Sequence, residues 1–141
     1  MSRTADKPDI KLKRKRVYEP ASAADGTRIL VDRLWPRGLR KEDAAIDYWF
    51  KDLAPSTALR QWFDHDVERW TEFRKRYRAE LAEQPQALAD LRSLARIGPI
   101  TLLFGAHDET HNNAVVLREL LGKRASVRTA TKSAGKTRRK T

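Results

Sequence analysis

The stretch ITLLFGAHDETHNN, residues 100–113, decides the fold, because a short apolar run leads directly into a polar loop. A run of this length, with Gly and Pro before it, is typical of a buried strand. The residues before it predict a helix over 85–96 that ends at Gly98-Pro99, and those after it predict a helix to about Leu121. Buried strands that alternate with helices favour an α/β fold, with a short, mostly parallel sheet flanked by helices.

Two more strands are predicted towards the N-terminus. RILVD, residues 28–32, is a second short apolar run, and IKLKRKRVY, residues 10–18, begins as an alternation of apolar and basic residues. The Asp25-Gly26 pair predicts a turn between them. KEDAAIDYWFKDL, residues 41–53, starts as a helical turn and can become extended in its second half, and the pattern leaves both interpretations open.

Helices are predicted through the middle of the chain. Ser56 is a good N-cap for a short helix, which the sequence DHD at 64–66 interrupts. A longer helix follows, because apolar residues recur at spacings of three and four. These residues are Val67, Trp70, Phe73, Tyr77 and Leu81.

The composition points to one soluble domain. A chain of 141 residues can bury one core, and the lack of cysteine excludes disulfides and thiolate chemistry. No apolar run approaches the ~20 residues that cross a bilayer, and the N-terminus lacks the apolar core of a signal peptide. We therefore expect a cytoplasmic protein with no membrane contact.

The net charge of +11 belongs to the ends of the chain. Residues 1–16 carry seven basic and two acidic side chains, and residues 122–141 carry eight basic and no acidic ones, so residues 17–121 have a net charge of −2. This division predicts a flexible N-terminus over 1–9, a domain over 10–121 and a disordered basic tail over 122–141. Such a tail either solubilises the protein or binds nucleic acid weakly and without specificity.

Two polar loops are expected to meet. Ligands of open α/β sheets bind beyond the carboxyl ends of the strands, and one loop follows each of the two apolar runs. If those strands are parallel neighbours, both loops lie on one rim of the sheet. The rim would then hold Asp32, Arg33, Trp35, Arg37, His107, Asp108, His111 and Asn112.

The first loop, DRLWPRG at 32–38, suits the binding of an anion. Arg33 and Arg37 lie on a segment that Pro and Gly constrain, and two guanidinium groups can bind phosphate or carboxylate in a bidentate way. Trp35 would line the ligand site, although a large aromatic side chain more often covers a core. Asp32 is a candidate acid or base, but it can instead accept backbone hydrogen bonds from the neighbouring loop.

The second loop combines a candidate base with a near match to a zinc motif. His111 could transfer protons at neutral pH and Asn112 could orient a ligand, while Asp108 or Thr110 can simply cap the following helix. The spacing of His107 and His111 approaches the H-E-x-x-H zinc signature. His107 nevertheless belongs to the loop rather than to a helix, and an Asp replaces the Glu. We therefore expect neither a metal nor a cofactor.

The chain resembles the YeaO-like bacterial proteins, domain-of-unknown-function family four hundred and eighty-eight. The resemblance covers roughly residues 16–121 and rests on RVYEPASAADGTRILVDRLWPRGLRKEDAAIDYW, LAPSTALRQWF, FRKRYRAEL and ITLLFGAHDETHNNAVVLRELL. It implies an α/β domain, and it implies that relatives commonly have Lys or Arg where this chain has His107. The residues that it marks as characteristic are Asp32, Arg33, Trp35, Pro36, Arg37 and Gly38, His111 and Asn112, and Tyr77, Glu80 and Leu81.

Two functions follow as hypotheses. The first is a small enzyme or binding protein for a phosphate-like or nucleotide-like anion, in which the arginines hold the ligand and Asp32 and His111 are the catalytic candidates. The second is a non-catalytic protein that associates with nucleic acid through residues 122–141. A third interpretation is that the rim is a polar network that only closes the sheet.

Overall fold

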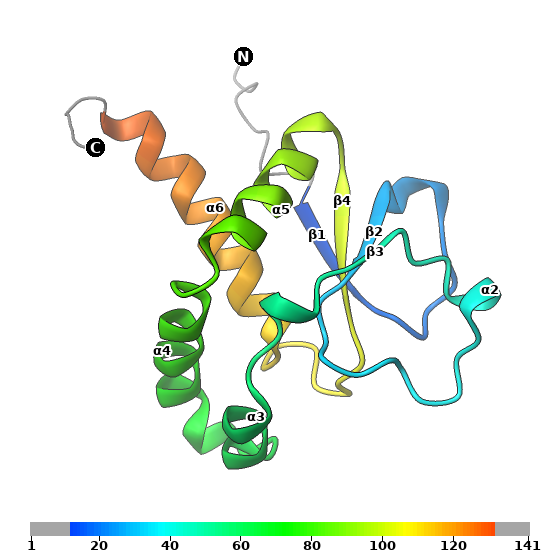
Figure 1. Ribbon diagram of the computed structural model, residues 1–141, viewed down its shortest axis with the longest axis horizontal. Coiled ribbons are helices and arrows are strands. Elements are labelled where there is room, and N and C mark those ends of the chain that lie inside the picture. The colour runs from blue at the N-terminus through cyan, green and yellow to red at the C-terminus, as the bar shows by residue number, and fades with distance from the viewer. Residues whose placement is uncertain (1–11, 132–141) are drawn as a thin grey trace.

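A four-stranded parallel sheet forms the centre of the computed structural model, which describes residues 12–131 (Figure 1). The strand order is β1 (Leu12–Arg16), β4 (Ile100–Phe104), β2 (Thr27–Leu30) and β3 (Tyr48–Trp49), and each neighbouring pair is parallel. All five residues of β4 are buried, as expected for a strand with a neighbour at each edge. The α/β prediction is confirmed, and so is the parallel pairing of β2 with β4.

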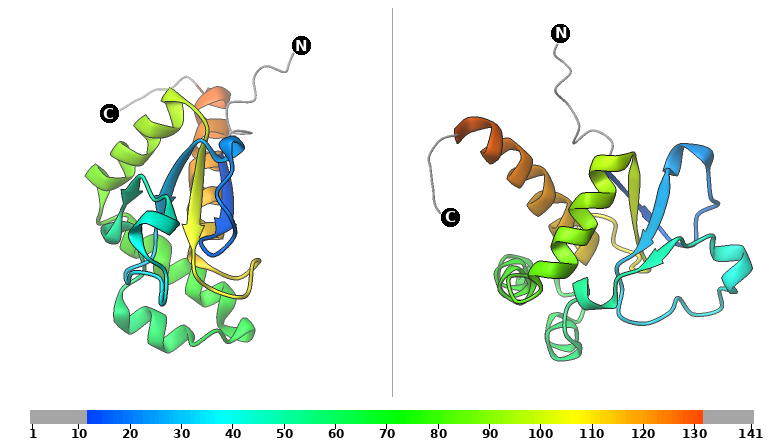
Figure 2. Two further views of the ribbon diagram at one scale, coloured as in Figure 1. Left: turned by 90° about the vertical axis from the view of Figure 1, so that its right-hand side faces the viewer. Right: turned by 45° about the horizontal axis from the view of Figure 1, so that its top comes forward.

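The two faces of the sheet are covered differently. Alternate strand residues point to opposite faces, so Ile29 and Leu102 join one core cluster and Leu30 and Leu103 join another. The larger cluster contains residues of four helices, and the smaller one is covered by the segment between β2 and β3 (Figure 2, left). The four helices are α3 (Thr57–Phe63), α4 (Trp70–Leu81), α5 (Pro85–Ile97) and α6 (Asn113–Thr131).

Short helical turns complete the chain, and they settle the stretch that the sequence left open. The structure gives KEDAAIDYWFKDL both conformations, first the single turn α2 (Lys41–Ala44) and then strand β3. The remaining turns are of the 3-10 type and are η2 (Ala23–Asp25), η3 (Lys51–Leu53) and η4 (Val67–Arg69).

The predicted end of the last helix is wrong. The sequence places it near Leu121, whereas α6 continues to Thr131. The segment from 122 lacks apolar periodicity, but its Ala, Arg and Lys residues are good helix formers, so the helix can continue without an apolar face. The expected flexible N-terminus over 1–9 and half of the predicted tail, residues 132–141, lie outside the described residues.

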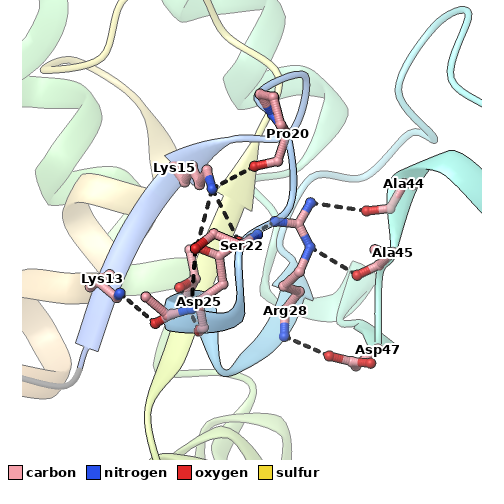
Figure 3. A network of polar contacts seen from close by, with 11 residues as sticks. Lys13, Lys15, Pro20, Ser22, Asp25, Arg28, Ala44, Ala45 and Asp47 are labelled. Carbon is pink, nitrogen blue, oxygen red and sulfur yellow. Dashed lines mark hydrogen bonds and ion pairs between the residues drawn. The ribbon is translucent and has the colours of Figure 1, made fainter.

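A buried ion network holds the turn before β2 (Figure 3). The Asp25 carboxylate accepts hydrogen bonds from Lys15 Nζ at 3.1 Å, Arg28 Nη1 at 2.6 Å and the Ser22 amide at 3.0 Å. Burial alone would raise the pKa of Asp25, but these partners outweigh it and hold that pKa below its ordinary value. Arg28 also donates to two carbonyls at the end of α2, and the network therefore joins both segments to the sheet.

No helix in the described part of the chain is both long and apolar enough to cross a membrane.

Candidate functional site

The loops after β2 and β4 meet at the edge of the sheet where both strands end (Figure 1). Between these loops and α3 lies a cavity of about 380 Å³. Its lining includes every residue that the sequence places on the rim except Asp108. The structure therefore brings the two predicted loops together around a space that can hold a small molecule.

Asp32 lies in the cavity wall and ties the two loops to each other. Its Oδ2 accepts a hydrogen bond from the Gly105 amide at 2.8 Å, and its Oδ1 accepts one from Asn113 Nδ2 at 3.0 Å. A Cβ atom at position 105 would lie 3.2 Å from Oδ2, so glycine permits this close approach. Burial raises the pKa of Asp32, while the hydrogen bonds from Asn113 and Gly105 and the charge of Arg60 oppose the rise.

His111 is held by a carboxylate from its own loop. Its Nδ1 lies 2.9 Å from Asp108 Oδ2, and its ring meets Trp70 edge to face with the centroids 5.2 Å apart. The other oxygen of Asp108 accepts hydrogen bonds from the Thr110 and His111 amides. Asp108 thus folds the loop instead of capping α6, and the imidazole faces the cavity in a fixed orientation.

Asn112 is the residue that caps α6. Its Oδ1 accepts a hydrogen bond from the Val115 amide at 3.1 Å, and its Nδ2 donates to the Asp108 carbonyl at 2.9 Å. Both interpretations that had Asp108 or Thr110 as the cap are therefore wrong. The reason is that the Asp108 carboxylate is already engaged within the loop, one turn before the helix begins.

The arginines of the cavity fall into two groups. Arg33 donates to the carbonyls of Pro55 and Ala54 at 3.3 and 3.4 Å, so its guanidinium supports the segment before α3. The side chains of Arg37 and Arg60 are exposed and line the cavity, and their guanidinium groups make no hydrogen bond or ion pair with any described residue. These two guanidinium groups are therefore free to bind a ligand.

Trp35 serves mainly as packing, the more common role for a large aromatic side chain. Its ring lies edge to face against Trp49 at 5.4 Å, it belongs to the smaller core cluster, and its Nε1 donates to the Leu39 carbonyl at 2.6 Å. Part of the side chain still lines the cavity. The indole is thus a rigid wall with its polar group already used.

All three histidines of the chain line the cavity, but they do not form a metal site. Within residues 12–131, no three His, Cys, Asp or Glu side chains are grouped so that they could hold a metal ion. His65 reaches the cavity from a left-handed backbone conformation, with φ of 57°, and Asp64 before it has φ of 45°. Two successive non-glycine residues in this region store strain, which is common at functional sites.

The long helix α4 supports the wall of the cavity from behind. Glu80 accepts hydrogen bonds from the Ser56 amide at 2.8 Å and the Ser56 hydroxyl at 2.6 Å, and the buried Tyr77 hydroxyl donates to the Leu53 carbonyl. The segment 53–56 provides the carbonyls that hold Arg33. Tyr77 and Glu80 therefore fix the position of α3 beside the cavity. The family resemblance marks both residues as characteristic.

Among the cavity-lining residues that the sequence did not predict are Tyr18, Arg60, Phe63 and Phe73. Tyr18 could have been found, because it follows β1 and the rule about the carboxyl ends of parallel strands applies to all of them. The other three lie on helices, and no sequence pattern shows which turn of a helix approaches the rim. Their approach depends on how α3 and α4 pack against the sheet.

Titration of Asp108 tests the geometry of the second loop. The hydrogen bond from the Thr110 amide lowers the pKa of Asp108 from 3.8 to about 2. Hydrogen bonds from the His111 side chain, the Thr110 hydroxyl and the His111 amide add to this effect, and together they outweigh the opposing effect of burial. Because the folded pKa is depressed, this carboxylate stabilises the loop above pH 3.8, and the contribution is lost as the pH falls towards 2. Carbon-detected NMR should show the Asp108 midpoint near 2. A midpoint near 3.8 would contradict the loop structure, and Asp108→Asn identifies the resonance by removing it.

Comparison with known proteins shows the family of the chain. Residues 10–137 match the family model described as the inactive DUF488-N3 subclade. The chain is 50% identical over 107 residues to the uncharacterized protein YeaO of Escherichia coli K12, which covers 76% of this chain and 93% of YeaO. It is 44% identical over 109 residues to the uncharacterized protein Rv3073c of Mycobacterium tuberculosis H37Rv, covering 77% and 92% of the two chains.

The uncharacterized protein Mb3100c of Mycobacterium bovis matches to the same extent as Rv3073c. No solved structure matches the chain. The family model extends past residue 121, where the resemblance in the sequence ends, and it includes the final turns of α6. The chain belongs to the DUF488 family, in the subclade described as inactive DUF488-N3.

Proposed function

We propose that this protein binds a small anion in the cavity between the two loops and does not transform it. The observation that carries the proposal is the pair Arg37 and Arg60, which come from different parts of the fold and line one cavity, and whose guanidinium groups make no hydrogen bond or ion pair with the described residues. An arginine that supports a fold is normally hydrogen-bonded, as Arg33 is here. Two free guanidinium groups suit phosphate or carboxylate.

The charge around the cavity supports this choice. Its lining contains three arginines and one carboxyl group, that of Asp32. The field in the cavity is therefore positive, and clefts lined by one sign of charge concentrate ligands of the opposite sign.

Asp32 and His111 are both held in place by other groups of the protein. Both oxygens of Asp32 accept hydrogen bonds from the protein, and Nδ1 of His111 is engaged by Asp108. A carboxyl group in this position organises the two loops. The description of the subclade as inactive agrees with a binding role, and we propose that both residues position the site.

Titration with inorganic phosphate, followed by amide NMR, tests the proposal. We expect the largest shifts in residues 33–37 and 105–113 and at Arg60, with a single saturating curve. Shifts that are spread over the basic surface without saturation would contradict a specific site. Sodium chloride at the same ionic strength is the control, because it screens charge without supplying a tetrahedral anion.

A further inference from the structure

Tyr18 lines the cavity and is partly open to solvent. The residue follows β1 and is 42% exposed. Other exposed large hydrophobic side chains, such as Val67 and Ile97, do not line this cavity. The exposure of Tyr18 is thus directed at the same cavity that the free arginines face.

The protein holds this ring in place. The Tyr18 hydroxyl donates to the Arg37 carbonyl at 3.0 Å, and the Arg16 guanidinium lies over the ring, 5.1 Å from its centroid. Arg16 is itself fixed, because it donates to the carbonyls of Ala106 and Gly105. An aromatic side chain that is exposed and yet fixed at both its hydroxyl and one face is pre-organised for contact with a ligand.

The hydroxyl contact also connects the ring with the anion site. Arg37 supplies the carbonyl that holds Tyr18 and the guanidinium that faces the cavity. Leu34, which is 63% exposed, lines the same space. The cavity therefore combines free cations with uncovered apolar surface, a pairing that a hydrated inorganic ion would leave unused.

We propose that the ligand is an aromatic anion, a planar ring that carries a phosphate group. The ring stacks on the open part of Tyr18, and the phosphate lies between Arg37 and Arg60. Stacking on an aromatic side chain strengthens binding of a flat ring by about tenfold or more. This inference rests on the proposed function, and it names the class of ligand for that site.

Comparison of phenyl phosphate, cyclohexyl phosphate and inorganic phosphate by calorimetry tests the inference. Phenyl phosphate should bind about tenfold more tightly than inorganic phosphate and more tightly than cyclohexyl phosphate, which has a similar size but is not flat. The ratio of the dissociation constants is the readout. Tyr18→Leu should bring the ratio of the two dissociation constants, that of inorganic phosphate over that of phenyl phosphate, close to one. Tyr18→Phe keeps the aromatic ring and should keep most of the tenfold ratio.

Tyr48→Leu is the matched control, because Tyr48 is 46% exposed and lies outside the cavity lining. It should leave the ratio unchanged. Equal affinity for all three compounds would overturn the inference and leave the proposed function standing. A preference for phenyl phosphate that survives Tyr18→Leu would have the same consequence. No binding of any of the three compounds would overturn both.

Discussion

Replacement of Asp25 by Ala should lower the free energy of unfolding by about 3–5 kcal/mol, the usual cost of removing one partner from a buried ion pair. The side chains of Asp25 and Arg28 are only 6% and 5% exposed, and their closest approach is 2.6 Å. Without the carboxylate, the Arg28 guanidinium keeps its contacts with two carbonyls but loses its counter-charge. Urea denaturation monitored by circular dichroism measures the loss.

The exposed pair Arg40–Asp43 provides the matched control. Its side chains are 73% and 58% exposed and 3.2 Å apart, so Asp43→Ala should change the free energy of unfolding by less than about 0.5 kcal/mol. The same chemical change is thus made in a buried and in an exposed pair. A loss below about 1 kcal/mol for Asp25→Ala would show that the network in Figure 3 does not stabilise the fold.

The double substitution Arg37→Ala, Arg60→Ala should weaken binding of inorganic phosphate by about 100-fold. A hydrogen bond to a charged group contributes about 1.5–3 kcal/mol, so each arginine accounts for roughly tenfold or more. Both guanidinium groups are exposed and make no hydrogen bond or ion pair with the described residues, so their loss should leave the free energy of unfolding nearly unchanged. Calorimetric titration with phosphate gives the affinity.

The control for this experiment removes the same charge elsewhere. Arg40 and Arg76 form exposed ion pairs with Asp43 and Glu72 and lie outside the cavity lining. Arg40→Ala, Arg76→Ala therefore tests whether phosphate responds to the total charge of the protein alone. An equal loss of affinity in the two double variants would contradict a site between Arg37 and Arg60.

The topology of the sheet could be predicted because its strands have strong local patterns. The run ITLLF is apolar throughout, as a strand buried on both faces must be, and RILV nearly so. The helices between them then require a parallel arrangement and place both loops on one rim. Ser56 was predicted as an N-cap for the same local reason, and its hydroxyl accepts the Leu59 amide at 3.1 Å.

The use of each polar group could not be predicted, because it depends on partners that are distant in sequence. Arg33 and Arg37 are alike on the loop, yet only Arg33 finds carbonyls within reach. Asp32 binds Asn113, 81 positions away, and Arg60 reaches the rim only because α3 packs beside it. The ion network was missed for a related reason, since the Asp25-Gly26 pair indicates a turn but not the burial of its carboxylate.

A crystal structure of the protein with phenyl phosphate shows most directly where an anion binds. The predicted result is a phosphate group within hydrogen-bond distance of the guanidinium groups of Arg37 and Arg60, with the ring against Tyr18. An empty cavity with the anion bound at another surface would contradict the account. A metal ion coordinated by His107 and His111 would contradict it as well.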